Sequence, residues 1–448
     1  MFVEWRNPGR EVAVIGLGRS GVAVSRLLRR GGVAVYASDK ASSADAASIR
    51  ELEALGVAVE VGSHDLIRIA GAAAVIVSPG VPPTAAAMLA AKKAGTPVFA
   101  EVDVAARSLA EGTRVLGVTG TNGKTTTTAL IAHLLAATGR PSVAAGNIGL
   151  ALSEVAMDAA APPWVVVELS SFQLHDAPHM TTKVGVFLNL TPDHLDRYGS
   201  LEAYYADKAN LFRNATPDSI WVTNADDKEV QRIAAGVPGT HLRFSLTEQT
   251  DAWYDATARR LMVGDTAVAS RSDLGLLGSH NVANALASIL AVHAAGIPLA
   301  SLGQGLATFD ALPHRLEPVG TVDGVVWIND SKATNVVSTT MATAALDTPF
   351  VLLLGGIHKG APYTSLAPTL RRCRAIVAYG EAAPIIARDL TGTVPVYQER
   401  LFEDVLARAL QLAQEGDAVL LSPACSSFDM FTNYEERGTT FREAVGRL

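Results

Sequence analysis

The chain has 448 residues, of which 49% are hydrophobic and 18% are charged, and its formal net charge is −7. This composition excludes a disordered chain, and the mild acidic excess argues against a general nucleic-acid binder. Two cysteines cannot form a disulfide framework, and no apolar run approaches the ~18 residues that a membrane helix needs. The N-terminus lacks the apolar core of a signal peptide. We therefore expect a cytoplasmic α/β protein without a membrane or nucleic-acid partner.

Short β-rich runs alternate with longer helical patterns, which is the rhythm of parallel sheets covered by helices. The length suggests roughly three domains, and we place them at 1–103, 104–312 and 313–448. Strands are expected at 12–15, 33–36, 74–77, 115–118, 165–168, 184–188, 325–328, 350–354, 375–378 and 418–421. Helices are expected at 21–30, from the loop at 120–124 to about 137, and at 281–295. The turn-rich stretch 241–275 predicts antiparallel strands.

The first glycine-rich loop is Gly16-Leu17-Gly18-Arg19-Ser20-Gly21, which follows a strand and precedes a helix. Asp39 stands at the end of the next strand, where it could accept a hydrogen bond from a ribose hydroxyl. This pattern suits a dinucleotide, any other diphosphate-containing nucleotide, or a tight turn without a ligand.

The second loop, Gly120-Thr121-Asn122-Gly123-Lys124-Thr125, also joins a strand to a helix. The strict phosphate-loop pattern fails, because Val118 stands where a glycine is required. Its second half is intact: Gly123 frees backbone N–H groups, Lys124 supplies a cation for phosphates, and the Thr125 hydroxyl can bind Mg²⁺. A nucleoside triphosphate therefore competes with a dinucleotide as the ligand.

Three further side chains are candidates on position alone. Glu168 ends a strongly apolar strand, where a carboxylate faces the ligand crevice of a parallel sheet. His194 could be a ligand or an ordinary loop residue. Composition alone makes Lys208 a surface lysine, and His133 is expected to be structural or solvent-facing.

Several motifs together resemble those of the Mur ligases, the ATP-dependent amide-forming enzymes of peptidoglycan precursor synthesis. The third part is similar to the D-glutamate-adding members of that family. The motifs are Gly120–Thr125, Glu168–Leu174, Asp193–Tyr198, His280–Leu286, Asn329–Asn335, Leu353–Gly356 with Lys359-Gly360, and Leu421–Asp429.

The resemblance implies an α/β fold of three domains. These are a Rossmann-like N-terminal domain for a UDP-linked substrate, a central P-loop ATPase-like domain for ATP, and a Rossmann-like C-terminal domain for the amino acid. It implies an ATP- and Mg²⁺-dependent ligase with two metal sites, which joins D-glutamate to UDP-N-acetylmuramoyl-L-alanine through an acyl phosphate. We expect a monomer.

Site residues are carried over by motif. Catalytic roles are implied for Lys124, Glu168, His194 and Lys208, and metal binding for Thr125, Glu168, His194 and Lys208 as a carbamate. The ATP contacts implied are Gly120, Thr121, Asn122, Gly123, Lys124, Thr125, Thr126, Asn281, Asn284, Arg315 and Asp330. The UDP-substrate contacts implied are Leu17, Arg19, Ser20, Asp39, Lys40, Asn147 and His194. The D-glutamate contacts implied are Lys332, Thr334, Lys359, Ser427, Phe428 and Tyr434.

One loop departs from the family pattern, because Ile357-His358-Lys359 replaces Asp-x-Lys and a neighbouring carboxylate is missing. Three alternatives remain open. A folate-type polyglutamylating ligase would share the ATP loop, but the segment 331–335 and the first glycine loop argue against it. An NAD-dependent dehydrogenase leaves Lys124 unexplained, and a non-catalytic nucleotide sensor would not need the polar third-part cluster.

Overall fold

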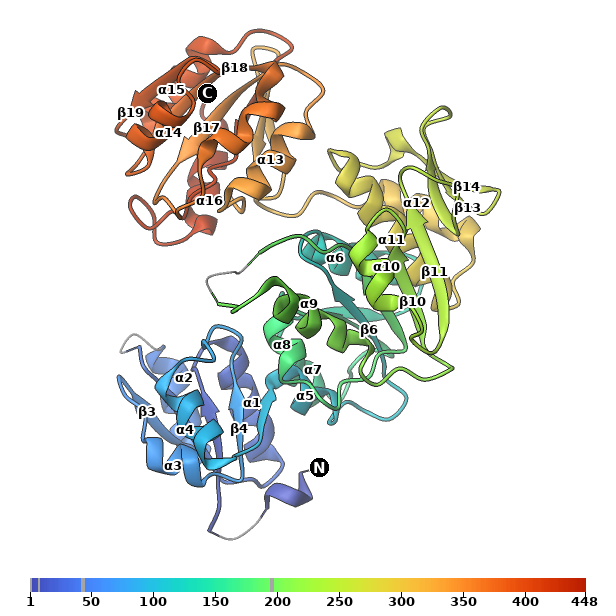
Figure 1. Ribbon diagram of the computed structural model, residues 1–448, viewed down its shortest axis with the longest axis vertical. Helices are drawn as coiled ribbons and strands as arrows, with labels where there is room; N and C mark the ends of the chain where they lie inside the picture. Colours follow the sequence, from blue (N-terminus) through green and yellow to red (C-terminus); the bar gives the residue numbers. More distant parts are fainter. Residues whose placement is uncertain (1, 7–8, 42–44, 194–196) are drawn as a thin grey trace. The chain divides into compact units, whose positions relative to one another are not determined.

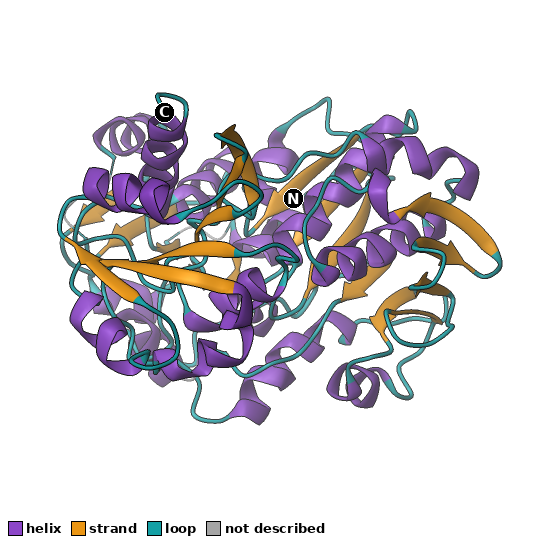
Figure 2. Cartoon of the chain, turned by 90° about the horizontal axis from the view of Figure 1, so that it is seen from above, coloured by secondary structure: helices purple, strands orange, loops and turns teal. Residues whose placement is uncertain are grey.

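The computed structural model describes residues 2–6, 9–41, 45–193 and 197–448. The chain forms two compact units, one made of Met1–Asp273 with Ala283–Ala307 and the other of Leu274–Val282 with Thr308–Leu448. The first unit contains a five-stranded and a nine-stranded sheet, and the second contains a six-stranded sheet (Figure 1). Figure 2, which is coloured by secondary structure, shows the strands lying between helices. The predicted α/β fold with three sheet-centred parts is confirmed.

The N-terminal sheet has the order β3-β2-β1-β4-β5, and all its pairs are parallel. Val12 and Val14 of β1 pack in the core that contains α1, whereas Ala13 and Ile15 pack in the core that contains α3 and α4. This explains why β1 is apolar at every position, since both faces of the sheet are covered. Its elements are η1 (Val3–Trp5), β1 (Val12–Ile15), α1 (Arg19–Arg30), β2 (Val35–Asp39), α2 (Ala46–Ala54), β3 (Ala58–Val61), α3 (Leu66–Gly71), β4 (Ala74–Val77), α4 (Ala86–Ala94), β5 (Val98–Ala100) and α5 (Glu101–Ala106).

The central sheet has the order β14-β13-β12-β11-β10-β9-β6-β8-β7. Strands β6 and β8 lie side by side in parallel, so the loops that follow them meet at one edge of the sheet. Its elements are β6 (Arg114–Thr119), α6 (Lys124–Ala137), β7 (Ser142–Gly146), α7 (Leu152–Met157), β8 (Trp164–Glu168), α8 (Ser171–His175), β9 (Val184–Phe187), α9 (Leu201–Ala209), η2 (Asn210–Phe212), β10 (Ile220–Asn224), α10 (Lys228–Ala234), β11 (Thr240–Ser245), β12 (Ala252–Asp255), β13 (Arg260–Val263), β14 (Thr266–Ser270), η3 (Arg271–Asp273), α11 (Ser279–Ala294), η4 (Leu299–Ser301) and α12 (Leu302–Ala307).

The prediction of antiparallel strands within 241–275 is wrong for β11. This strand runs parallel to both β10 and β12, and within the stretch 241–275 the antiparallel pairs are β12 with β13 and β13 with β14. The reason is the connection through α10, because a strand–helix–strand crossover returns the chain in the same direction.

The sheet of the second unit has the order β15-β16-β20-β17-β18-β19, in which β15 alone is antiparallel to its neighbour. Strand β17 again alternates between two cores, with Leu352 and Leu354 on one side and Val351 and Leu353 on the other. Its elements are β15 (Glu317–Val322), β16 (Val325–Asn329), α13 (Val336–Ala344), β17 (Phe350–Gly355), η5 (Tyr363–Arg372), β18 (Cys373–Tyr379), α14 (Ala383–Asp389), β19 (Val396–Glu399), α15 (Phe402–Leu412), β20 (Ala418–Leu421) and α16 (Tyr434–Val445).

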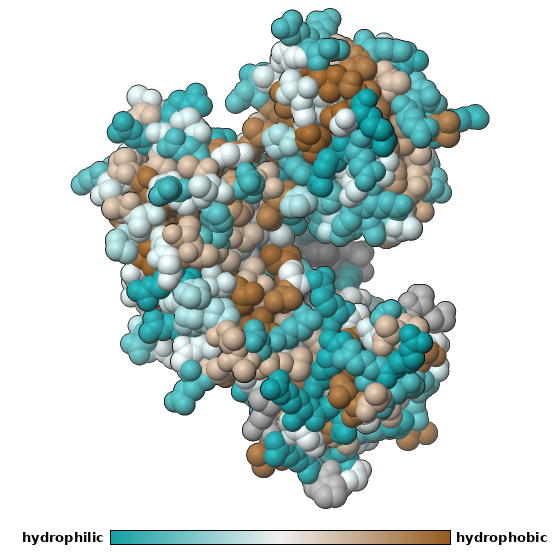
Figure 3. All heavy atoms as spheres, turned by 180° about the vertical axis from the view of Figure 1, so that it is seen from behind, coloured by the Kyte–Doolittle hydropathy of each residue, from teal (hydrophilic) through white to brown (hydrophobic). Residues whose placement is uncertain are grey.

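On the face drawn in Figure 3, hydrophobic residues occur in patches among hydrophilic ones. Within the described ranges, no helix is both long and apolar enough to cross a bilayer.

Helix α5 carries two buried carboxylates that join it to the central part of the first unit. Glu101 is 1% exposed, and its Oε1 accepts a hydrogen bond from the Ser153 amide of α7 at 2.6 Å. Asp103 is fully buried and binds both the amide and the ring Nδ1 of His179. Burial is the largest influence on Glu101 and raises the pKa of its carboxyl to about 7.

We expect Glu101→Gln to change how stability depends on pH. Because the folded-state pKa is raised, the native carboxyl favours its proton, and its stabilising contribution is lost as the pH rises through about 7. The variant keeps an acceptor for the Ser153 amide but cannot ionise. Its free energy of unfolding, relative to that of the wild type, should therefore rise by about 1–3 kcal/mol as the pH increases from about 5 to about 8. Melting temperatures of both proteins across this range check the prediction, and parallel curves would contradict it.

Candidate functional site

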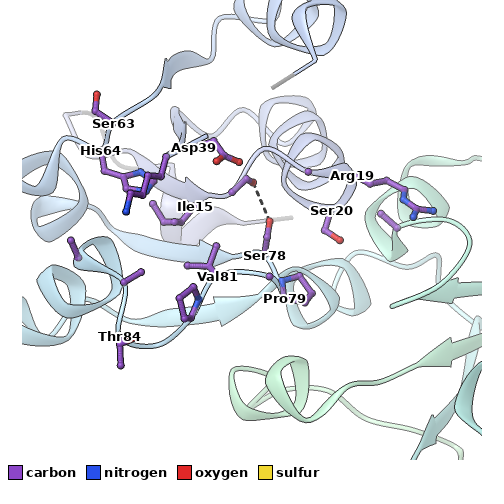
Figure 4. Close-up of a pocket in the computed structure, with 18 of the residues that line it drawn as sticks. Ile15, Arg19, Ser20, Asp39, Ser63, His64, Ser78, Pro79, Val81 and Thr84 are labelled. Carbon is purple, nitrogen blue, oxygen red and sulfur yellow. Dashed lines mark hydrogen bonds between the residues drawn. The ribbon is translucent and has the colours of Figure 1, made fainter. Parts of the chain in front are cut away.

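A cavity of about 840 Å³ lies beside the first glycine-rich loop, and its lining is drawn in Figure 4. Five of the residues predicted to contact the UDP-linked substrate line it, namely Arg19, Ser20, Asp39, Lys40 and Asn147. Leu17 does not line it and is 7% exposed. Sequence reasoning missed Ser63, His64 and Thr84, which also line this cavity. The position of Ser63 and His64 just after β3 could have indicated these two residues, whereas no sequence signal marks Thr84.

Gly21, in the first turn of α1, lies very close to the backbone of the glycine-rich loop. A Cβ on Gly21 would lie 1.8 Å from the Gly16 carbonyl oxygen, so only glycine fits there. Ser78 Oγ donates to the same carbonyl at 3.0 Å (Figure 4). The N-cap residue of α1 is Gly18, which has no side chain to cap the helix, so the first turn presents amide groups suited to an anion.

Asp39 fixes the backbone around this cavity. Its Oδ2 accepts from the Leu17 amide at 2.7 Å, and its Oδ1 accepts from the Ala41 amide at 2.8 Å. The predicted ribose acceptor thus holds the glycine-rich loop against the end of β2.

The second glycine-rich loop, Gly120–Thr125, joins β6 to α6 as predicted. Gly120 and Gly123 have φ angles of 152° and 82°, in the region that favours glycine. Asn189 clamps the loop, because its Oδ1 accepts from the Asn122 amide at 2.8 Å and its Nδ2 donates to the Asn122 carbonyl at 3.1 Å. Sequence reasoning assigned no role to Asn189, although it follows the apolar strand β9.

Lys124 and Lys208 meet at the carbonyl of Gly120. Lys124 Nζ donates to the Gly120 and Thr121 carbonyls at 2.8 and 2.7 Å, and Lys208 Nζ donates to the Gly120 carbonyl at 2.8 Å. Both lysines line a cavity of about 300 Å³, to which Asn147 and Tyr204 also contribute.

The expectation that Lys208 lies on the surface is wrong, because its side chain is 2% exposed. Ser200 caps α9 by accepting from the Ala203 amide, and the helix carries Lys208 inward, 5.0 Å from the ring centroid of Tyr204. Burial, followed by the charge of Lys124, lowers the pKa of Lys208 well below its usual value. A lysine with a lowered pKa loses its proton more easily, and the neutral amine is a nucleophile.

Glu168 is 2% exposed at the end of β8. Its Oε1 accepts from Asn147 Nδ2 at 2.9 Å, whereas its buried Oε2 has no hydrogen-bond partner in the described part of the chain. A buried carboxylate oxygen without a partner is costly, and it suits a hard cation such as Mg²⁺. Among the described residues, no group of three or more His, Cys, Asp and Glu side chains could hold a metal. His194 lies outside the described residues.

The two asparagines of α11 are both buried. Asn284 lies against the phosphate loop, since a Cβ on Gly123 would be 2.4 Å from its Oδ1. Asn281 Nδ2 donates to the Leu277 carbonyl at 2.8 Å. His133, expected to be structural or solvent-facing, is half-buried, and its Nε2 lies 3.0 Å from the Gly305 carbonyl oxygen.

Arg315 and Asp330, the other predicted ATP contacts, belong to the second unit. Asp330 is 8% exposed, and its carboxylate accepts from the Leu316 amide at 3.2 Å and from Ser422 Oγ at 2.8 Å. Burial is the dominant cause that raises the pKa of Asp330 to about 7.

The predicted amino-acid contacts lie on three segments of the second unit. Lys332 Nζ sits 3.7 Å from the ring centroid of Tyr434, at the start of α16. The Ala424 amide donates to the Ala333 carbonyl at 2.9 Å, which joins the segment containing Lys332 and Thr334 to the one containing Ser427 and Phe428.

The loop that carries Lys359 lies beside this second segment. The Ile357 amide donates to the Ser426 carbonyl at 2.9 Å, and Lys359 itself is exposed. His358 lies next to the position of the missing carboxylate, and its Nδ1 is 3.1 Å from the Tyr363 hydroxyl.

Close relatives exist over nearly the whole length of the chain. A UDP-N-acetylmuramoylalanine--D-glutamate ligase of Myxococcus xanthus is 40% identical, covering 98% of this chain and 99% of the relative. The chain belongs to the Mur ligase family. Three family models agree with this assignment, a MurD-like N-terminal domain at 10–100, a Mur ligase middle domain at 118–292 and a Mur ligase glutamate ligase domain at 314–425.

Further comparisons place the fold among solved Mur ligases. A Geobacillus kaustophilus enzyme with the same name as the Myxococcus relative is 39% identical, covering 98% of both chains. The solved UDP-N-acetylmuramate-alanine ligase MurC of Thermotoga maritima aligns with a TM-score of 0.63 at 19% identity, covering 98% of this chain and 99% of that one. MurF ligase of the same organism, solved in complex with ADP, also gives 0.63 at 18% identity and full coverage of both chains.

Proposed function

We propose that this Mur ligase uses ATP to join D-glutamate to UDP-N-acetylmuramoyl-L-alanine, in the cytoplasmic synthesis of peptidoglycan precursors. The observation that carries the proposal is the identity of about 40% with relatives of that name over nearly the full chain. The motifs of the second unit support the choice of D-glutamate, since Lys332, Tyr434 and Ser427 lie on segments that contact one another.

The proposed reaction proceeds without a covalent intermediate on the protein. The L-alanyl carboxylate attacks the γ-phosphorus of ATP, forming an acyl phosphate and releasing ADP. The amine of D-glutamate then attacks the acyl carbon, and the tetrahedral intermediate collapses to an amide and inorganic phosphate. The protein positions three anionic reactants and offsets their charge.

Residues of the first unit are proposed to bind ATP and the UDP-linked substrate. We propose that Lys124 binds the β- and γ-phosphates while the amides of Gly120–Thr125 hold them in place. The cavity lined by Arg19, Asp39 and Asn147 would receive the uridine diphosphate end of the substrate. The uncapped N-terminus of α1 supports this placement, because it favours an anion.

The residues around the phosphate loop fit Mg²⁺, because Thr125 offers a hydroxyl and Glu168 a buried oxygen that has no hydrogen-bond partner among the described residues. We propose that Thr125, Glu168, His194 and a carbamylated Lys208 hold two Mg²⁺ ions. When bound, Mg²⁺ would supply positive charge to the ATP phosphates.

We further propose the domain boundaries 1–103, 104–312 and 313–448, with a monomeric enzyme and no membrane or nucleic-acid partner. Asn281, Asn284, Arg315 and Asp330 are proposed ATP contacts. For Asn284 the support is its position against Gly123.

ADP release tests the function directly. Purified protein is incubated with ATP, Mg²⁺ and UDP-N-acetylmuramoyl-L-alanine, and each amino acid is added in turn. The proposal expects rapid ADP release with D-glutamate and little with L-glutamate or L-lysine. Turnover that is independent of the amino acid, or that prefers another amino acid, would refute it.

Selectivity between D-glutamate and D-glutamine should depend on Lys359. An exposed ion pair contributes only about 0–1 kcal/mol, whereas a hydrogen bond to a charged group that has lost its water contributes about 1.5–3 kcal/mol. We propose that the cleft closes on bound D-glutamate and removes water from Lys359, and we therefore expect Lys359→Ala to raise the KM for D-glutamate about tenfold or more, with the KM for ATP much less changed. D-Glutamine should be a poor substrate of the wild type. Steady-state kinetics would show a misplaced pocket if ATP affinity fell instead, or if both amino acids served equally.

A further inference from the structure

Arg437 is a fully buried arginine in α16, and none of the site assignments above uses it. Its guanidinium spans two separate segments of the second unit. Nε donates to Ser331 Oγ and Nη2 to the Ser331 carbonyl, both at 2.9 Å. Nη1 and Nη2 also both donate to the Cys425 carbonyl at 3.3 Å.

These bonds end next to the proposed amino-acid contacts. Ser331 immediately precedes Lys332, and Cys425 lies two positions before Ser427. Ser331 Oγ in turn donates to the Tyr434 carbonyl at 2.8 Å, and the Tyr434 ring lies under Lys332 Nζ. One guanidinium therefore ties together the three backbone segments that carry Lys332, Ser427 and Tyr434.

Burying a cation here is energetically unfavourable. Among the described residues Arg437 forms no salt bridge, and its guanidinium donates to a hydroxyl and to carbonyl oxygens, which are all neutral. A well-packed apolar side chain is commonly no less stabilising at such a site, so stability alone accounts poorly for an arginine. A planar fork of five donors spread over three nitrogens can bridge two carbonyls and a hydroxyl at fixed spacing, whereas a lysine offers three donors from a single nitrogen.

We propose that Arg437 is a positioning residue for the amino-acid substrate. It fixes the loop at 331–334 relative to the loop at 425–428 and so sets the spacing of Lys332 and Ser427, without touching the substrate itself. This inference rests on the proposed function, because it takes those loops as the D-glutamate pocket.

The test compares the variants Arg437→Met, Arg437→Lys and Ser331→Ala with Phe441→Leu. Phe441 is the matched control, because it is buried in the same helix but packs against Trp327 in the core, with ring centroids 5.9 Å apart. We expect Arg437→Met to raise the KM for D-glutamate about tenfold or more, while the KM values for ATP and the UDP-linked substrate stay within about twofold. Arg437→Lys should recover only part of the loss, and Ser331→Ala should raise the same KM about threefold.

Thermal unfolding of each variant separates positioning from stability. Phe441→Leu should lower the melting temperature and leave the KM for D-glutamate unchanged. An unchanged KM for D-glutamate in Arg437→Met would overturn the inference, as would an equal rise of all three KM values. If Arg437→Met does not fold, an unchanged KM in both Ser331→Ala and Arg437→Lys would overturn it. Failure of the wild type to use D-glutamate would instead refute the proposed function.

Discussion

Replacing Lys208 with alanine should reduce ligase turnover by about 10²–10³-fold, although composition alone predicts an ordinary surface lysine at this position. Its amine is buried, points at the Gly120 carbonyl of the phosphate loop and lies near the charge of Lys124. These surroundings lower its pKa well below the usual value, because burial and a neighbouring cation both disfavour the charged form.

A neutral amine can attack carbon dioxide, forming an N–C bond and releasing one proton to give a carbamate. The carbamate would replace a potential cation with an anion beside Glu168. Its oxygens could then bind Mg²⁺, which prefers oxygen ligands. We therefore expect acetate or formate to restore part of the activity of Lys208→Ala, since a small carboxylate fits the space that the side chain leaves.

The matched control is Lys228→Ala, which removes an exposed lysine from α10 in the same unit. It should keep wild-type turnover and show no response to acetate. Wild-type activity in Lys208→Ala would contradict the carbamate, and loss of activity without any rescue would limit Lys208 to a structural role.

Replacing Lys124 with methionine should reduce turnover about 10³-fold or more, because this side chain supplies the phosphate loop's own cation. The binding of UDP-N-acetylmuramoyl-L-alanine should change less than about twofold, since Lys124 does not line the cavity proposed for the uridine diphosphate. ADP release measures the first quantity and isothermal titration calorimetry the second.

A further consequence concerns Lys208. The charge of Lys124 helps to lower the pKa of Lys208, so Lys124→Met should raise that pKa and reduce the share of neutral amine. Added bicarbonate should therefore raise the activity of the variant more than that of the wild type. Equal loss of UDP-substrate affinity and turnover would contradict the assignment of Lys124 to ATP.

Local patterns predicted the elements that carry the glycine-rich loops. Strand β1 matches its prediction at Val12–Ile15, and α6 ends at Ala137 as expected. Both predictions rest on signals within a few residues, an apolar run buried on two faces and a helix that ends before glycine. The direction of β11 could not be read in this way, because it depends on the crossover through α10.

The parts of the site that the sequence concealed all depend on distant contacts. Burial of Lys208 requires α9 to pack against a loop 88 positions earlier in the chain. The clamp that Asn189 makes on Asn122 spans 67 positions, and the bonds of Arg437 to Ser331 span 106. Polar residues of this kind have no periodicity that marks them as buried, so their roles emerge only when the fold brings their partners together.

Transfer of an oxygen isotope tests the central claim most directly. The protein is incubated with ATP, Mg²⁺, D-glutamate and UDP-N-acetylmuramoyl-L-alanine that carries ¹⁸O in both oxygens of its alanyl carboxylate. The products are then separated, and their masses are measured by mass spectrometry. The proposed reaction predicts a D-glutamyl adduct that retains one labelled oxygen in its new amide, and inorganic phosphate that carries the other. Unlabelled phosphate, or ADP formation without the adduct, would contradict the account.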